Sequence, residues 1–141
     1  MHHPDLGQVD MLVLPEHRLS LSRFRGEVRT AMVLAALQGT LKAYPGIAGF
    51  HCICDLRQHT GHLGVKGMNA IMALRHGTTG PRPPTRSVLI SHDSGMIFTA
   101  RYLDHLAPHV THSVCPDPAA ALARATGGPM PEAALAFLTA P

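Results

Sequence analysis

The stretch Phe50-His51-Cys52-Ile53-Cys54-Asp55-Leu56 decides the fold of this chain. It is almost continuously apolar, the pattern of a strand covered on both faces of a parallel sheet, and a polar loop rich in Gly and His follows it. A second such run, Val88-Leu89-Ile90, predicts another buried strand over residues 87–91. Between the two strands, apolar positions at helical spacing predict a helix over 65–76. Parallel strands joined by a crossover helix are therefore expected.

Further elements flank this centre on both sides. Residues 9–14 and 18–25 predict two strands joined by a turn at 15–17, with a bulge at Phe24, which is out of phase with the alternating leucines before it. Residues 77–86 hold three prolines and two glycines and predict a loop. The other predicted elements are helices over 29–44, 96–107 and 118–125 and a strand over 110–115.

The order of these elements predicts a single α/β domain over residues 9–126. Its mixed, mainly parallel sheet starts with an antiparallel hairpin and is flanked by helices. Residues 1–8 predict a flexible tail, and 127–141 predict a Gly-Gly-Pro hinge followed by a helix over 131–138. That apolar helix is expected to cover the domain's own sheet edge or to dock on a second copy, and a homodimer is the commonest soluble assembly.

The composition excludes several classes of protein. The 141 residues are 45% hydrophobic and 15% charged, with a formal net charge of +3 that rises by one for each of 11 histidines protonated in acid. Only two lysines, two Tyr and no Trp argue against a nucleic-acid partner. The absence of a long apolar run and of a charged-then-apolar leader predicts a cytoplasmic protein without a membrane span. His105, His109 and His112 are expected at the surface or at element boundaries.

Two groups of residues resemble chemical sites. Cys52, Cys54, His59 and His62 have the types of a zinc site, but the two cysteines lie on one face of a covered strand, where they pack as small hydrophobes. Ser91-His92-Asp93-Ser94 holds the types of a hydrolytic triad, but contiguous side chains diverge, and Asp93 or Ser94 is expected to cap the next helix. We therefore expect no metal, no cofactor and no catalytic residue.

One edge of the sheet is the candidate binding site. Ligands of open α/β sheets bind at the carboxyl ends of parallel strands, and a helix N-terminus beside this edge favours an anionic group. The residues predicted to bind a ligand or partner there are Asp55, Arg57, His59, Thr60, His92, Asp93 and Ser94.

Residues 25–126 resemble the SpoIIAA-like (STAS-related) family of small bacterial α/β proteins. The segments that carry the resemblance are Gly26-Glu27, Asp55-Leu56-Arg57, residues 86–90, Ala100-Arg101-Tyr102 and residues 118–122. The resemblance implies a mixed sheet flanked by helices and a non-enzymatic binding or regulatory module. Anti-sigma-factor antagonists of this kind carry Asp-Ser-Ser-Gly after the third strand; here His59-Thr60-Gly61-His62 stands there, with Thr60 as the one candidate phosphoacceptor.

Three functions follow as hypotheses. A regulatory module, the first of them, binds another protein through an exposed surface around residues 60–68 and has no deep pocket. A carrier of a small apolar or anionic ligand, similar to lipid-carrying CRAL-TRIO domains, has an apolar cavity lined by Met68, Met72 and Met96. A small enzyme or metal-binding protein brings Asp55, His59 or His92 together at the strand-end edge.

Overall fold

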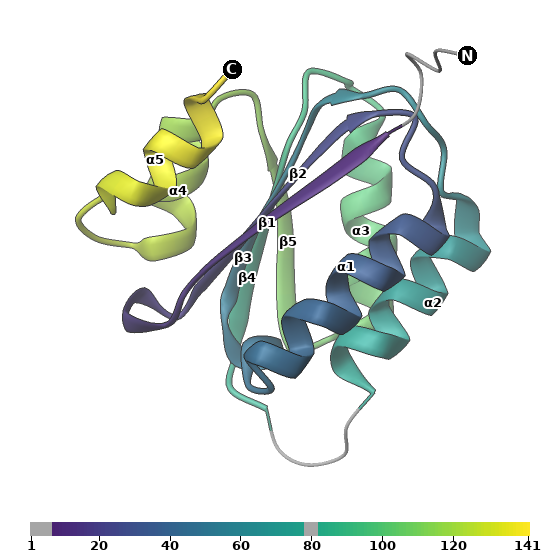
Figure 1. The fold of residues 1–141 in the computed structure, drawn as a ribbon, viewed down its shortest axis with the longest axis horizontal. Coiled ribbons are helices and arrows are strands. Elements are labelled where there is room, and N and C mark those ends of the chain that lie inside the picture. The colour runs from purple at the N-terminus through teal and green to yellow at the C-terminus, as the bar shows by residue number, and fades with distance from the viewer. Residues whose placement is uncertain (1–6, 78–81) are drawn as a thin grey trace.

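Over residues 7–77 and 82–141, which the computed structural model describes, the chain forms a five-stranded mixed sheet between two layers of helices (Figure 1). The strands lie side by side in chain order. They are an antiparallel hairpin of β1 (Gln8–Leu14) and β2 (Leu19–Gly26), followed by β3 (His51–His59), β4 (Thr85–Ile90) and β5 (Val110–Cys115) in parallel. The predicted α/β fold with a mixed, mainly parallel sheet is confirmed.

The helices cover both faces of the sheet (Figure 1). We name the two sides the three-helix face and the two-helix face. The three-helix face carries α1 (Thr30–Ala43), α2 (Gly64–His76) and α3 (Met96–Leu106), and the two-helix face carries α4 (Pro118–Thr126) and α5 (Glu132–Thr139). Within the described residues, no helix is both long and apolar enough to cross a membrane.

Local chemistry explains where α4 begins and ends. The Asp117 carboxylate accepts a hydrogen bond from the Ala120 amide at 2.8 Å, which satisfies one of the free amides of the first turn. Pro118 occupies the first helical position, where a missing N–H costs nothing. Gly127 ends the helix in the left-handed conformation, at φ +65°, which side chains other than Gly rarely adopt.

Two strand boundaries differ from the prediction. β3 extends to His59 rather than Leu56, because Gln58 and His59 still pair with the end of β2. β4 begins at Thr85, inside the predicted 77–86 loop, because its first residue pairs with Val110 of β5. Polar residues therefore continue both strands where composition predicted a loop. Residues 78–81 of that loop and 1–6 of the predicted 1–8 tail lie outside the described residues, and Gln8 already belongs to β1.

The bulge predicted at Phe24 lies on the neighbouring strand instead. Two consecutive pairs join Arg23 to Asp55 and Arg25 to Gln58, so β3 holds the extra residue, whereas β1 pairs with β2 without interruption. Phe24 is buried and belongs to the cluster of Val28 and Val33 on the three-helix face. It departs from the alternation because β2 is covered on both faces, so successive residues are all buried.

The two faces of the sheet are packed with side chains of different size. Large aliphatic residues point to the two-helix face, where they form a continuous core with α4 and α5: Leu19, Leu21, Ile53, Val88 and Ile90. Of the alternate positions, which point to the three-helix face, Ser20, Ser22, Cys52, Cys54 and Ser87 are small, whereas Phe24, Leu56 and Leu89 are large. The first face is therefore filled, whereas the second leaves space beneath its helices.

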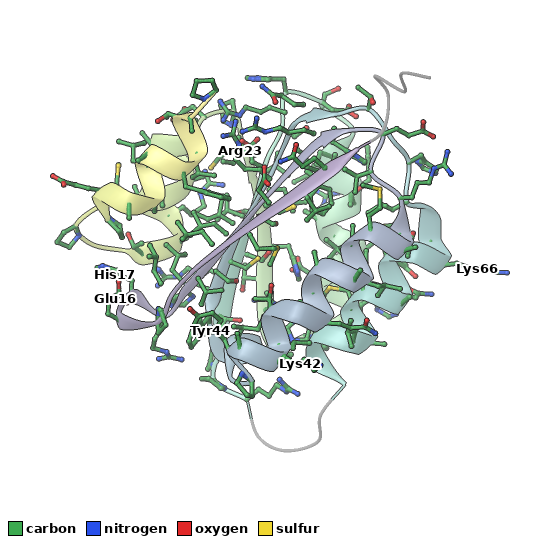
Figure 2. All side chains as sticks on the ribbon, viewed as in Figure 1. Glu16, His17, Arg23, Lys42, Tyr44 and Lys66 are labelled. Atoms are coloured by element: carbon green, nitrogen blue, oxygen red, sulfur yellow. The ribbon has the colours of Figure 1, made fainter. Side chains whose placement is uncertain are left out.

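The C-terminal helix packs on the chain's own sheet. Ala134 and Leu138 of α5 are fully buried in the core of the two-helix face. At the far end of the helix, the guanidinium of Arg23 on β2 donates hydrogen bonds to the carbonyls of Phe137 and Ala140, at 2.8 and 2.7 Å (Figure 2). Of the two expected positions for this segment, the structure shows the one on the domain's own sheet, across its face rather than its edge.

Candidate functional site

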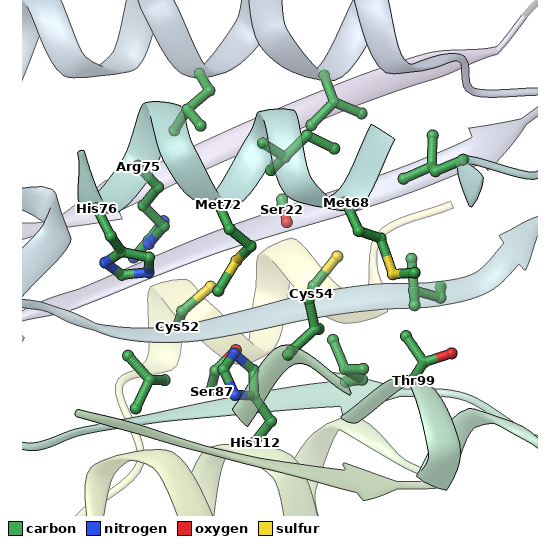
Figure 3. A pocket seen from close by; sticks show the side chains of 18 of the residues that line it. Ser22, Cys52, Cys54, Met68, Met72, Arg75, His76, Ser87, Thr99 and His112 are labelled. Atoms are coloured by element: carbon green, nitrogen blue, oxygen red, sulfur yellow. The ribbon is translucent and has the colours of Figure 1, made fainter. Parts of the chain in front are cut away.

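A cavity of about 170 Å³ lies between the three-helix face of the sheet and the helices that cover it (Figure 3). Its floor includes the small side chains of Ser22, Cys52, Cys54 and Ser87, and larger strand residues such as Leu89 also line it. Apolar side chains of the three helices close it from above, among them Val33, Leu37, Ile71, Met72 and Leu103. Because helices cannot move closer than their backbones allow, short floor residues leave a void that longer ones would fill.

Sulfur-containing side chains form the middle of this cavity. Met68 and Met72 of α2 point down toward Cys52 and Cys54 of β3 (Figure 3). Burial raises the pKa of the Cys54 thiol to about 12, although a hydrogen bond with Ser22 opposes the rise. The thiol is therefore neutral at physiological pH and contributes a polarizable, nearly apolar wall rather than a nucleophile. Such a surface suits an apolar ligand.

One end of the cavity is polar. It lies where α2 ends, and Arg75 and His76 of that helix line it (Figure 3). The Arg75 guanidinium donates from Nη2 to Ser20 Oγ and to the Ile47 carbonyl, both at 3.1 Å. The ring of His76 packs edge to face on that of His109, with centroids 4.9 Å apart. Burial is the main cause that lowers the pKa of His76 to about 3, with the charge of Arg75 adding to it, so the ring is neutral at pH 7.

His112 of β5 lines the same cavity. Its side chain is almost fully buried, and its Nδ1 lies 2.9 Å from Asp104 Oδ1, which also accepts from the His112 amide at 2.7 Å. Burial lowers the pKa of His112, against the opposing effect of Asp104. The prediction that His112 lies at the surface or a boundary is wrong, because its strand is covered on this face.

Asp55 and Arg57, predicted at the strand-end edge, belong to a buried network on the two-helix face. Asp55 Oδ2 accepts from Arg57 Nη2 at 2.8 Å, and the same oxygen lies 3.4 Å from Arg23 Nε. Arg57 Nη2 also donates to the Leu138 carbonyl at 2.9 Å. Arg23 and Arg57 together therefore hold the last carbonyls of α5. Asp55, 3% exposed, holds both guanidinium groups in place.

His59 is the last residue of β3, and Thr60 follows it in the segment that leads to α2. The His59 ring packs edge to face on Phe24, with centroids 5.6 Å apart, and burial lowers its pKa. Thr60 is exposed, and its amide donates to the Gly26 carbonyl at 3.0 Å. Within the part of the chain that the structure describes, neither residue forms a hydrogen bond with Asp55 or Arg57.

His92, Asp93 and Ser94 are exposed and surround a shallow hollow of about 330 Å³ after β4. Asp93 Oδ1 accepts from the Gly95 amide at 2.8 Å, so this carboxylate shapes the turn that leads into α3 and does not reach the helix amides themselves. The structure therefore distributes the seven edge residues over three places. Ligand binding by them stays a prediction.

A search of solved structures finds the same arrangement of strands and helices elsewhere. An uncharacterized protein of the DUF3478 family from Shewanella loihica PV-4, whose crystal structure shows a SpoIIAA-like fold, aligns with a TM-score of 0.65 and 14% identity. The alignment covers 89% of this chain and 99% of the Shewanella protein. This chain has a SpoIIAA-like fold. No protein-family model and no curated protein matches its sequence.

Within this SpoIIAA-like fold, the cavity was only partly predictable. Met68 and Met72 line it, as the carrier hypothesis required, whereas Met96 does not, because α3 contributes Thr99 and Leu103 from its next turns. Sequence reasoning missed Arg75 and His112. A usable signal was the regular placement of Ser or Cys on one face of three adjacent buried strands, which predicts a thinly filled layer.

The SpoIIAA-like chain shows no metal centre in the part that the structure describes. No group of three or more His, Cys, Asp or Glu side chains there could hold an ion. Cys52 and Cys54 line the cavity, as expected for cysteines packed as small hydrophobes, whereas His59 packs on Phe24.

Proposed function

We propose that this protein is a non-enzymatic binding protein that takes up a small apolar molecule in the cavity beneath α1, α2 and α3. The observation that carries the proposal is the contrast between the two faces of the sheet. The same strands place only large aliphatic residues in the core of the filled face, whereas Ser and Cys occupy several positions on the face with the cavity, beside larger residues such as Leu89. A domain selected only for stability gains from filling such a space, because each buried methylene contributes about 0.8 kcal/mol.

The volume sets the size of the ligand. A cavity of about 170 Å³ compares with the roughly 150 Å³ of an apolar protein cavity that holds benzene. The occupant is therefore of the size of a single ring or a short branched chain. A full-length lipid does not fit, so the comparison with lipid carriers extends to the apolar lining and not to the cargo.

The cavity favours the carrier over the two other hypotheses. A purely regulatory module predicted no deep pocket, although Val65, 57% exposed within the 60–68 stretch, leaves that surface available to a partner. An enzyme required Asp55, His59 or His92 to converge. Asp55 instead pairs with Arg23 and Arg57, and His59 packs on Phe24.

Filling the cavity should weaken binding. Ser87→Leu places an aliphatic chain on the floor of the cavity, and we expect the affinity for benzyl alcohol to fall about 10-fold to 100-fold, the loss of roughly 1.5–3 kcal/mol of apolar contact. Isothermal titration calorimetry measures the affinity, and circular dichroism confirms the fold. Native mass spectrometry of freshly purified wild-type protein should also show a bound species of low mass.

The matched control makes the same substitution at the rim of the shallow hollow. Ser94→Leu changes an exposed residue of the predicted strand-end edge and should leave the affinity unchanged. If Ser94→Leu weakens binding and Ser87→Leu does not, the ligand binds at the edge and the cavity proposal is wrong.

The remaining expectations concern assembly and location. A homodimer and a bacterial, cytoplasmic location stay predictions, and α5 is not free to dock on a second copy through the surface it buries in its own core. Sedimentation of the full chain at high concentration should show a dimer. A monomer there would contradict the expected assembly and leave the cavity proposal intact.

A further inference from the structure

The polar end of the cavity carries an unbalanced positive charge. Arg75 reaches it from the last turn of α2, and its side chain lies beside that of His76 (Figure 3). Both acceptors of Arg75, Ser20 Oγ and the Ile47 carbonyl, are neutral. Among residues 7–77 and 82–141, no carboxylate lies within ion-pair distance of Arg75. By contrast, the guanidinium groups of Arg23, Arg25, Arg29 and Arg57 each lie beside an Asp or Glu.

The acid beside His112, which lines the same cavity, is already committed. Asp104 accepts hydrogen bonds from both the ring and the backbone amide of His112. It therefore compensates the buried imidazole and is not available to Arg75. A guanidinium offers five N–H donors in a planar fork that matches a carboxylate, and the two hydrogen bonds of Arg75 both leave from Nη2.

A second observation at the same end points to a missing partner. His76 Nδ1 is buried and has no hydrogen-bond partner within the part of the chain that the structure describes. Buried polar atoms are nearly always paired, and His76 lines the cavity, so a bound molecule there is a candidate partner for this atom. The charges of Arg75, Arg82 and His109 around this ring all have the same sign when protonated. An anion would accept a hydrogen bond from this nitrogen in its N–H tautomer and would balance the charge of Arg75.

From these observations we propose that the ligand is a small apolar carboxylic acid, bound with its carboxylate at Arg75 and His76 and its apolar body among Met68, Met72 and the cysteines. This inference rests on the proposed function and names the class of ligand. The single guanidinium matches one negative charge, and the remaining wall is apolar, so a monocarboxylate with a ring or short branched chain fits both the charge and the volume.

The test compares three probes of nearly equal size: benzoate, benzamide and benzyl alcohol. We expect wild-type protein to bind benzoate about 10-fold to 100-fold more tightly than either neutral probe, the usual gain of a charge-assisted hydrogen bond. Arg75→Gln keeps a donor for Ser20 and Ile47 but removes the charge, and it should abolish this preference while benzyl alcohol still binds. Arg29→Gln makes the same change at an exposed residue outside the cavity and should preserve it.

A measurement on the unmodified protein keeps the test independent of the stability of the variants. Benzoate should shift the imidazole resonances of His76 in nuclear magnetic resonance spectra, whereas benzyl alcohol should shift those of cavity methyl groups only. If the neutral probes bind and benzoate binds no more tightly, the carboxylate assignment is wrong and the proposed function stands. If none of the probes binds, both are wrong.

Discussion

Asp55→Ala should destabilise the protein by about 3–5 kcal/mol, because it leaves buried guanidinium charge without a partner. Arg23 and Asp55 are both nearly inaccessible, with side chains 5% and 4% exposed. Asp55 Oδ1 also accepts from the Arg57 amide and from Arg57 Nε, at 3.1 and 3.0 Å. A single truncation therefore removes the counter-charge of two arginines that hold the end of α5. Urea unfolding monitored by circular dichroism measures the loss.

The control for this variant is Asp93→Ala. It also removes a carboxylate with a backbone hydrogen bond, to the Gly95 amide, but at an exposed turn, so we expect a change below about 1 kcal/mol. A destabilisation of the same size at both positions would show that the buried network is not a special contributor. Ligand binding in the cavity should survive Asp55→Ala in the folded fraction, since the network lies on the opposite face of the sheet.

Stability should also fall steeply as the pH drops below about 6.5. The pKa values of His51, His59, His76, His109 and His112 all lie below the ordinary value, in each case chiefly because burial disfavours the charged ring. The unfolded chain, with ordinary imidazoles, therefore binds more protons than the folded protein below pH 6.5. Each excess proton lowers the free energy of unfolding by about 1.4 kcal/mol per pH unit.

The pH range over which stability is lost follows from the direction of the pKa shifts. The contribution of the neutral rings is present above pH 6.5 and is lost as the pH falls, and for His76 the loss continues to its folded-state pKa of about 3. Asp55 acts in a different range. Burial alone would raise its pKa, but hydrogen bonds and charges from Arg57 and Arg23 lower it below the ordinary value. Its contribution is therefore lost only below about pH 4.

Urea midpoints at pH 7, 6 and 5 measure the slope of this dependence. His76→Gln removes one titrating ring and should make the slope shallower by up to one proton, whereas His105→Gln, at an exposed position of α3, should leave it as in the wild type. A free energy of unfolding that is constant from pH 7 to pH 5 would contradict the prediction. His112, which was expected at the surface or at a boundary, thus acts on stability from the interior.

Sequence reasoning predicted the order and type of the elements because each strand and helix carries its own local pattern. The continuous apolar run through Ile53 predicts a buried strand, and Asp117 followed by Pro118 predicts a helix start, without reference to the rest of the chain. The role of Asp55 and Arg57 was different. Their partners include the Leu138 carbonyl, 81 positions away, and no local pattern indicates which carbonyls a distant helix will bring.

The cavity, too, could be predicted only in part from the sequence. Its methionines were predictable as candidates because a Met-rich helix face is adaptable. Its polar end was not, because Arg75 and His112 come from α2 and β5 and meet only through the parallel arrangement of the strands. A sequence pattern indicates to which helix or strand a residue belongs. A cavity, in contrast, forms where short side chains from several elements together leave space unfilled.

The order of the strands has a consequence for how this chain acquires its structure during synthesis. Strands β1 to β5 occupy neighbouring positions in the order in which a ribosome would deliver them, so each can pair with a strand already made. The carbonyls that complete the hydrogen bonding of Arg23 belong to residues 137 and 140, which emerge after all five strands. The sheet can therefore pair before α5 is made, and until α5 packs on it the Arg23–Asp55 pair remains open to water.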